Sequence, residues 1–229
     1  MYRFLIRPRW LVGHVVILGL VAALVSLGMW QLDRLDQRRA SNSQLIQRGS
    51  APARTNAPRP GSTADVAGYR FVLSGTFDAS GEVLVRGRVR AGLPGYEVLT
   101  PLVVGEGEAV LINRGYVPQQ IGEQWPTPAA APPSGVVTVE GIARPTESGS
   151  LKASDSTSRV LVISGIRLAD LDAMVPYDLA PVWVQAVTGA SSGDFPAPLP
   201  PADLSEGSHL SYAIQWFLFS LIAAGGWLV

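Results

Sequence analysis

The sequence predicts a membrane protein in which two helical spans, one N-terminal and one C-terminal, flank an extracytoplasmic, mostly antiparallel β domain with a minor helix. Three observations predict this fold class: an apolar run near the N-terminus, a second at the C-terminus, and short β-branched runs between them. Hydrophobic residues make up 47% of the 229 residues and charged residues only 16%, which is more apolar than is typical of a soluble domain.

Charge and cysteine content exclude several classes of function. The 18 basic and 18 acidic residues balance, so the chain has no overall field that would attract nucleic acid, and we expect no nucleic-acid partner. Cysteine is absent, which excludes disulfides, thiolate metal sites and a cysteine nucleophile.

The first predicted span covers residues 10–30, which include no charged residue and are bracketed by Trp10 and Trp30. About 20 residues at about 1.5 Å each match a hydrocarbon core of about 30 Å, and tryptophan is typical of its two interfaces. A cleaved signal peptide is the alternative, but the apolar run is too long and no small-residue cleavage site follows it. Residues 31–61 are predicted as a helical extension, 33–48, and a Pro- and Ala-rich linker, 51–61.

The second predicted span begins near Leu210, within a helical segment assigned to residues 204–229, and is still apolar at Val229. Asp203 and Glu206 have the spacing of a capping box, which predicts that this helix starts just before the membrane. Small residues spaced four apart would allow close packing of helices in the membrane; they are Gly19 with Ala23, and Ser220 with Ala224.

Arginines near the first span predict the orientation. The short tail 1–9 carries Arg3, Arg7 and Arg9 without an acidic residue, which favours a cytoplasmic N-terminus. Arginines also follow the span, but they open a long loop, and long loops cross membranes largely regardless of charge. We therefore expect both termini in the cytoplasm, the middle outside it, and a multi-pass protein of a bacterial plasma membrane.

Residues 62–203 are predicted to form the β domain, a barrel or sandwich. Turn sequences at 78–81 and 105–108 indicate hairpin-like connections, and residues 168–175 read as the minor helix. The runs rich in β-branched residues are 69–77, 82–90, 96–104, 109–117, 136–144, 159–163 and 182–187.

Two patterns in this domain invite a functional interpretation. Gly189, Ser191 and Gly193 match the Gly-x-Ser-x-Gly hydrolase pattern, but the prolines that follow prevent the required helix, so we predict an ordinary loop. Three alternating arginines would share one face of a strand, where they would contact an anionic group or form a solvated sheet face; they are Arg86, Arg88 and Arg90.

The chain has only two histidines, and both fall in the predicted spans. His14 lies on the cytoplasmic side, where we predict packing or a hydrogen bond between helices. His209 begins the second span, with Tyr212 and Trp216 on its own helical face. A neutral imidazole there could ligate haem iron, or it could bond to the β domain, and the residues alone leave both readings open. Antiparallel spans place His209 level with about Gly28, so the two histidines cannot share one metal ion.

Six segments in order make the chain resemble the surfeit locus protein 1 family of cytochrome c oxidase assembly factors over nearly its whole length. Tyr116 is a departure, because the family more often has Trp there. The segments are Met-Trp-Gln-Leu-Asp-Arg at 29–34, Gly-Tyr-Glu-Val-Leu-Thr-Pro-Leu at 95–102, Val-Leu-Ile-Asn-Arg-Gly-Tyr-Val-Pro at 110–118, Val-Glu-Gly at 139–141 with Arg144, Pro-Val-Trp-Val-Gln at 181–185, and His-Leu-Ser-Tyr-Ala-Ile-Gln-Trp-Phe at 209–217.

The resemblance implies a non-enzymatic accessory or assembly factor of haem-copper cytochrome c oxidase. It implies His209 as a ligand of haem a, although we expect no tightly bound cofactor and no metal site. It also implies that Asn113, Arg114 and Gly115 form a turn that presents Arg114 to a partner, while burial of a paired arginine would look the same in sequence. Expected partners are oxidase subunits, membrane lipid and a cytochrome bc complex in a supercomplex.

Two other functions compete with the assembly factor. A structural subunit would stay bound to the mature oxidase or supercomplex and clamp its subunits. A membrane-anchored hydrolase would need a base, and only His14 and His209 could serve.

Overall fold

The computed structural model describes residues 8–58, 66–147 and 160–228. The described residues form two compact units, which divide between residues 44 and 45 and between residues 201 and 202. The first unit holds residues 8–44 and 202–228, and the second holds the described residues from 45 to 201. The elements, in chain order, are α1 (Pro8–Ser50), β1 (Arg70–Phe77), η2 (Ala79–Gly81), β2 (Val83–Arg90), β3 (Leu93–Gly105), β4 (Glu108–Pro118), α3 (Gln119–Gly122), η3 (Pro128–Ala130), β5 (Val136–Arg144), β6 (Leu161–Ile163), α4 (Leu168–Asp172), β7 (Asp178–Leu179), β8 (Trp183–Thr188) and α5 (His209–Leu228).

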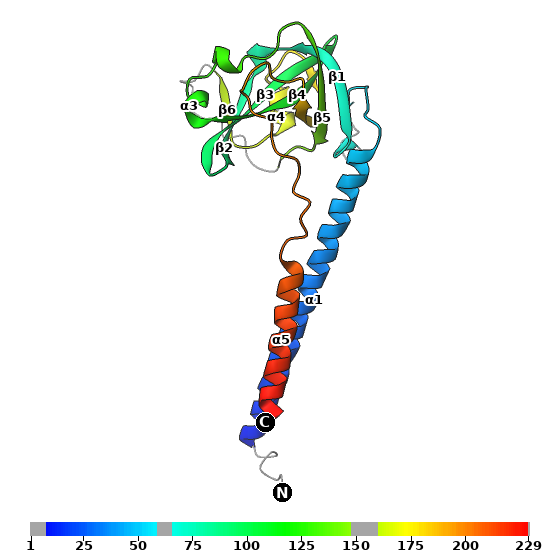
Figure 1. Ribbon diagram of the computed structural model, residues 1–229, viewed down its shortest axis with the longest axis vertical. Coiled ribbons are helices and arrows are strands. Elements are labelled where there is room, and N and C mark those ends of the chain that lie inside the picture. The colour runs from blue at the N-terminus through cyan, green and yellow to red at the C-terminus, as the bar shows by residue number, and fades with distance from the viewer. Residues whose placement is uncertain (1–7, 59–65, 148–159, 229) are drawn as a thin grey trace. The chain divides into compact units, whose positions relative to one another are not determined.

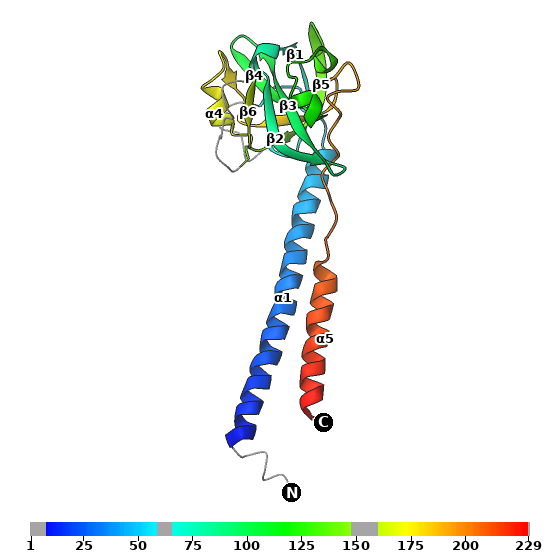
Figure 2. The ribbon, with the colours of Figure 1, turned by 90° about the vertical axis from the view of Figure 1, so that its left-hand side faces the viewer.

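Helices α1 and α5 make up the helical unit, and each is long and apolar enough to cross a membrane. They lie side by side and run in opposite directions (Figure 2), because Gln31 contacts His209 while His14 contacts Trp227. The helix predicted over 10–30 and its extension to 48 are confirmed as one continuous helix. The predicted tail residues Arg3 and Arg7 lie outside the described residues, as do Val229 and the end of the linker.

A seam of less exposed side chains joins the two helices. Its members recur at alternating steps of three and four residues, the 3.5-residue period of coiled-coil packing. On α1 the seam residues are His14, Ile17, Val21, Leu24, Gly28, Gln31, Leu35, Arg38 and Asn42, and on α5 they are His209, Ala213, Trp216, Ser220, Ala223 and Trp227.

Small residues bring the helices close, but only some of them are those that the sequence indicated. A Cβ on Gly28 would lie 2.5 Å from the Phe217 ring, so a larger residue there would force the ring or the helices to shift. Gly19 has no neighbour within 4 Å and Ala23 is exposed, so this pair does not contribute to the packing of α1 against α5. Ser220 is buried in the seam as predicted.

The helix start predicted from the capping box is wrong, whereas the start of the apolar span predicted near Leu210 agrees with the structure. α5 begins at His209, not at residue 204, and Asp203 and Glu206 do not cap it. The Asp203 carboxylate accepts from the Ser205 backbone N–H at 2.8 Å, and Glu206 pairs with Arg39. A local turn and an ion pair to the other helix therefore take the groups that a capping box would need.

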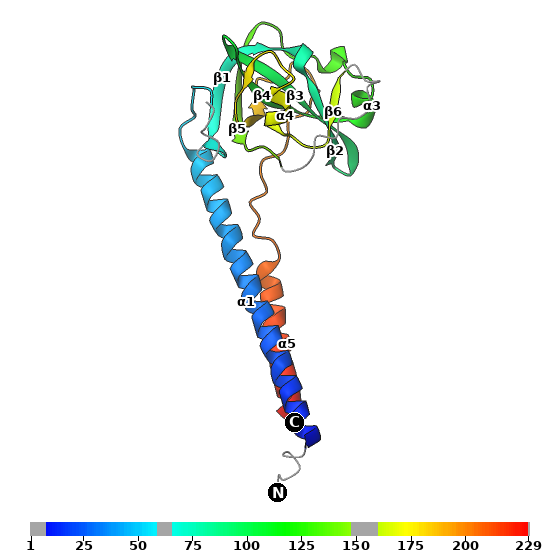
Figure 3. The same ribbon diagram turned by 180° about the vertical axis from the view of Figure 1, so that it is seen from behind.

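The second unit is a closed barrel (Figures 1 and 3). In the described residues eight strands form one sheet, and the pairing of β3 with β4 closes a ring in the order β3, β1, β5, β8, β4. β2 and then β6 continue the sheet from β3, and β7 pairs with β4. Most pairs are antiparallel, as predicted, but β2–β6, β4–β7 and β4–β8 are parallel.

The predicted strands agree with the observed ones to within a few residues at each end, except that the first residue predicted in the 159–163 run lies outside the described residues. The turn at 105–108 joins β3 and β4, which pair, whereas 78–81 does not form a hairpin because β3 separates β1 from β2. Apolar side chains fill the barrel, among them Phe71, Leu73, Leu102, Ile112 and Val184. A second cluster lies under α4 and includes Val85, Leu99, Leu111 and Ile163.

Candidate functional site

His209 is the first residue of α5 and is half-buried in the helix seam. Its Nδ1 lies 2.9 Å from Oε1 of Gln31 on α1. An amide oxygen only accepts hydrogen bonds, so Nδ1 donates and carries the ring proton. In the described residues Nε2 has no hydrogen-bond partner, so its lone pair is free to bind a ligand.

Three side chains of α1 hold the segment that leads into α5. Asn42 donates to the Leu204 carbonyl at 2.6 Å, and Arg38 donates to the Ser205 carbonyl at 3.1 Å. Arg39 forms a two-pronged ion pair with Glu206 at 2.8 and 2.9 Å, which lowers the pKa of the Glu206 carboxyl. These contacts fix where α5 starts on α1, and so they fix which α1 residue His209 meets.

The two aromatic residues predicted beside His209 lie on its helical face, but in different surroundings. Trp216 is half-buried in the seam and meets Phe219 edge-on at 6.1 Å between ring centroids. Tyr212 is 47% exposed, one turn along from His209. An apolar planar ligand at His209 would therefore find one exposed aromatic ring next to it on the same helix.

His14 makes the interhelical hydrogen bond that was predicted. Trp227 Nε1 donates to His14 Nδ1 at 2.7 Å, and the two rings meet edge-on. Gln31 and His14 are 17 positions apart (31 minus 14), which is about 26 Å along a helix at about 1.5 Å per residue. The two histidines are therefore separate sites, and His209 is level with Gln31 rather than with Gly28 as expected.

Arg114 lies inside the barrel, in the middle of strand β4, and is only 1% exposed. Its guanidinium donates to Glu82 Oε1 at 2.7 Å and to the carbonyls of Ala190 and Ala130 at 2.8 and 2.9 Å. Glu82 also accepts from the hydroxyl of Thr100 and the indole of Trp125. The expectation that a turn presents Arg114 to a partner is therefore wrong, and the alternative of a buried, paired arginine is confirmed.

Burial also sets the ionisation of this pair. It raises the pKa of Glu82, against the opposing effect of its hydrogen bond from Thr100 and of the Arg114 charge, and it lowers the pKa of Arg114. An arginine remains protonated because its ordinary pKa is so high. Removing Arg114 would thus leave a buried carboxyl without its counter-charge.

Asn113 and Gly115 are buried beside Arg114 and also have internal roles. Asn113 donates to Glu97 at 2.8 Å and accepts from the Gly115 backbone N–H at 3.1 Å. A Cβ on Gly115 would lie 2.3 Å from the Ala197 carbonyl oxygen, so the neighbouring chain needs a glycine there. Because Asn113 and Gly115 are both buried, neither residue can contact another protein.

The three arginines of β2 are not equivalent. The pairing of β2 with β3 shifts by one residue between Val85 and Arg88, so a bulge breaks the alternation that the prediction assumed. Arg88 is half-buried and binds Glu147 at 2.7 and 2.9 Å, with Glu97 at 3.4 Å. Arg86 and Arg90 are exposed and remain candidates for an anionic contact.

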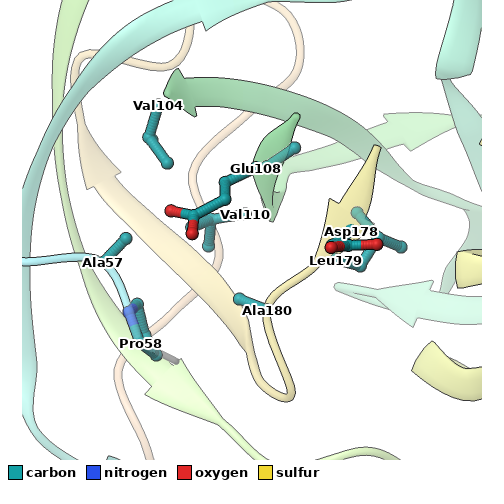
Figure 4. Close-up of a pocket in the computed structure, with 9 residues that line it drawn as sticks. Ala57, Pro58, Val104, Glu108, Val110, Asp178, Leu179 and Ala180 are labelled. Atoms are coloured by element: carbon teal, nitrogen blue, oxygen red, sulfur yellow. The ribbon is translucent and has the colours of Figure 1, made fainter. Parts of the chain in front are cut away.

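One pocket of the barrel unit lies against β4 and β7, where Glu108 and Asp178 line it together with Ala57 and Pro58 (Figure 4). No group of three or more metal-ligating side chains occurs in the described residues. Ser191 lies in a loop and donates to the carbonyls of Gly193 and Phe195, as predicted for a segment that is not a hydrolase elbow.

Two important residues were missed as site residues by sequence reasoning. Gln31 belongs to the segment 29–34 that carried the family resemblance, and a polar residue at the end of an apolar span was a signal that could have found it. Trp227 had no such signal, because an aromatic residue near a span end is ordinary.

Comparisons with known proteins agree on one family. The model of the SURF1 family matches residues 18–221. A protein named as an uncharacterised SURF1-like protein of Mycobacterium tuberculosis is 31% identical over 97% of this chain and 83% of its own length, and one of Mycobacterium bovis is equally similar. A SURF1-like protein of Monosiga brevicollis is 30% identical over 92% of this chain and 87% of its own.

Proposed function

The chain belongs to the SURF1 family, and on that premise we propose that it handles haem a, through His209, for the catalytic subunit of a haem-copper cytochrome c oxidase. The family is linked to cytochrome oxidase assembly and is not a known class of enzyme. The two apolar helices suggest a membrane protein. From the arginines of the N-terminal tail we further propose that both termini are cytoplasmic and the barrel lies outside, in the plasma membrane of a bacterium.

The state of the His209 ring is the observation that supports the proposal. Its Nδ1 proton is held by Gln31, which leaves the Nε2 lone pair available, and this is the form of imidazole that ligates iron. His209, Tyr212 and Trp216 would hold the haem, and the bound group would supply an iron centre that could take an imidazole nitrogen as a ligand.

A haem titration of the full-length chain in detergent tests this function. Ferric haem a should give a shifted Soret band with the wild-type chain, and His209→Ala should weaken binding at least about tenfold, as loss of a metal ligand or its support does. His14→Ala is the matched control, because His14 is the only other histidine and its Nδ1 already accepts from Trp227. Equal binding by wild type and His209→Ala would overturn the proposal.

A stably bound structural subunit is the second candidate function. The observation in its favour is that Gly19 has no neighbour within 4 Å and is left unused by α5, so that face of α1 can admit another helix closely. In this reading the chain would remain with the oxidase, or with a cytochrome bc complex in a supercomplex. Tagging the oxidase and measuring the chain's stoichiometry in active enzyme separates the two, since a transient factor would be present well below one copy.

A further inference from the structure

The two histidines are held in opposite tautomers by partners on the facing helix. At His209 the partner is an acceptor, the Gln31 amide oxygen, so the ring proton is on Nδ1. At His14 the partner is a donor, the Trp227 indole N–H, so Nδ1 carries the lone pair and the proton is on Nε2. Only His209 therefore presents a free lone pair at Nε2, the ring nitrogen farther from the backbone.

We propose that Gln31 is a positioning residue that locks His209 in the Nδ1–H tautomer and directs its Nε2 towards the iron of a bound haem. The tautomer assignment stands on the geometry alone, whereas the identity of the ligand as haem rests on the proposed function. Metal-ligating histidines commonly donate their second N–H to a carbonyl or carboxylate, which fixes the ring and makes the ligating nitrogen more basic. Gln31 occupies that supporting place here, from a position 178 residues away in sequence.

The seam explains how this contact is held in register. Gln31 and His209 both belong to the half-buried seam, so the facing helix partly encloses each of the two side chains. The contacts of Asn42, Arg38 and Arg39 with residues 203–206 hold the chain just before His209 on α1. The Gln31–His209 hydrogen bond is therefore supported on its outer side by three further links between the same two segments.

Gly207 keeps the ligating edge of the ring uncovered. Its φ of +70° is in the left-handed region, where glycine is favoured, and it turns the chain onto α5. A Cβ at this position would lie 3.6 Å from Cδ2 and 3.7 Å from Nε2 of His209, in van der Waals contact with the edge that a ligand must approach. Gly207 thus helps a ligand to reach Nε2 of His209, while Gln31 sets the orientation of the same ring.

The first arm of the test examines the ligand-free protein. The chain has only two histidines, so imidazole ¹⁵N spectra of the full-length protein in detergent, at a pH where free histidine is neutral, contain two ring systems. We expect one ring of each tautomer. Gln31→Leu should convert His209 into a tautomer mixture, Gln31→Glu should retain the Nδ1–H form, and Trp227→Phe should alter only His14.

The second arm titrates ferric haem a into the same four proteins. Gln31→Leu should weaken binding about 10- to 100-fold, the range found for loss of a supporting group behind a metal ligand, whereas Trp227→Phe should change it less than about twofold. Gln31→Glu should restore binding and lower the midpoint potential of the bound haem relative to wild type, because a carboxylate acceptor makes the ligating nitrogen more basic. A general loss of helix pairing would instead affect Gln31→Leu and Trp227→Phe alike.

The two arms fail in different ways. An unchanged His209 tautomer in Gln31→Leu would overturn the positioning role whatever the haem titration gives. Opposite tautomers that respond as expected, in a wild-type chain that does not bind haem a, would overturn the proposed function and leave the positioning of His209 in place for another ligand. Equal haem affinity in wild type and Gln31→Leu would show that orientation by Gln31 does not contribute to binding, which also overturns the inference.

Discussion

Buried polar side chains are used in different ways in the barrel and in the helix pair. Inside the barrel, the Arg114 guanidinium donates hydrogen bonds to Glu82 and to two backbone carbonyls, and Glu82 also accepts from Thr100 and Trp125. In the helix seam, Nδ1 of His209 is hydrogen-bonded to Gln31, whereas Nε2 has no hydrogen-bond partner in the described residues. A network in which every polar group is hydrogen-bonded stabilises one packed structure. An imidazole at a helix end with only one of its two nitrogens hydrogen-bonded can use the other to bind a ligand.

Arg114→Met should give the largest effect and would show that the barrel network is structural. Loss of the guanidinium leaves the Glu82 carboxylate buried without its partner, and breaking a buried pair in this way costs about 3–5 kcal/mol of unfolding free energy. Denaturant unfolding of the full-length chain in detergent, followed by near-UV circular dichroism, measures the loss. Arg86→Met is the control, because Arg86 is exposed, and it should change the stability little.

The cost of Arg114→Met should also depend on pH. Burial already raises the pKa of Glu82, and without Arg114 that pKa rises further. A carboxyl whose folded pKa exceeds its unfolded pKa favours the folded state below the unfolded value and loses this contribution as pH rises through the folded value. The variant should therefore be closer to wild type at about pH 5 than at about pH 8. A loss independent of pH would mean that Glu82 is not the source of the cost.

Gly28→Leu should have a smaller effect, confined to the helix pair. A Cβ at this position would lie 2.5 Å from the Phe217 ring, so the helices must separate or the ring must move, and overpacking of this kind costs about 1–3 kcal/mol. Gly19→Leu places the same side chain on the same helix where nothing lies within 4 Å, and it should be tolerated. Label-to-label distances between the helices, from cysteines introduced into this cysteine-free chain, would measure the separation.

Arg39→Gln should have the smallest effect of the three. The ion pair with Glu206 is on the surface, where such pairs contribute little and are screened by salt. We expect unchanged unfolding of the barrel and, at low ionic strength, only a slight weakening of haem binding at His209. A loss as large as that of Gln31→Leu would mean that the segment before α5, rather than Gln31, governs the orientation of His209.

Much of the fold follows from local patterns. Two apolar runs, the first bounded by Trp10 and Trp30, specify helices of span length, and alternating β-branched runs between Gly and Pro specify strands, because these signals act within a few residues. His209 could also be singled out, since a chain with two histidines offers few ligands and one of them begins a span. The bulge between Val85 and Arg88 could not be foreseen, because it depends on which strand pairs with β2.

The sequence by itself determined the kinds of element, their approximate limits and the identity of the candidate ligand. Only the tertiary structure decided that Arg114 is buried against Glu82, that α5 begins at His209, and that Gln31 and Trp227 give the two histidines opposite tautomers. Each of these outcomes depends on a partner far away in the chain. Packing and the need to pair every buried polar group determine which distant residue becomes the partner, and a local sequence pattern specifies neither.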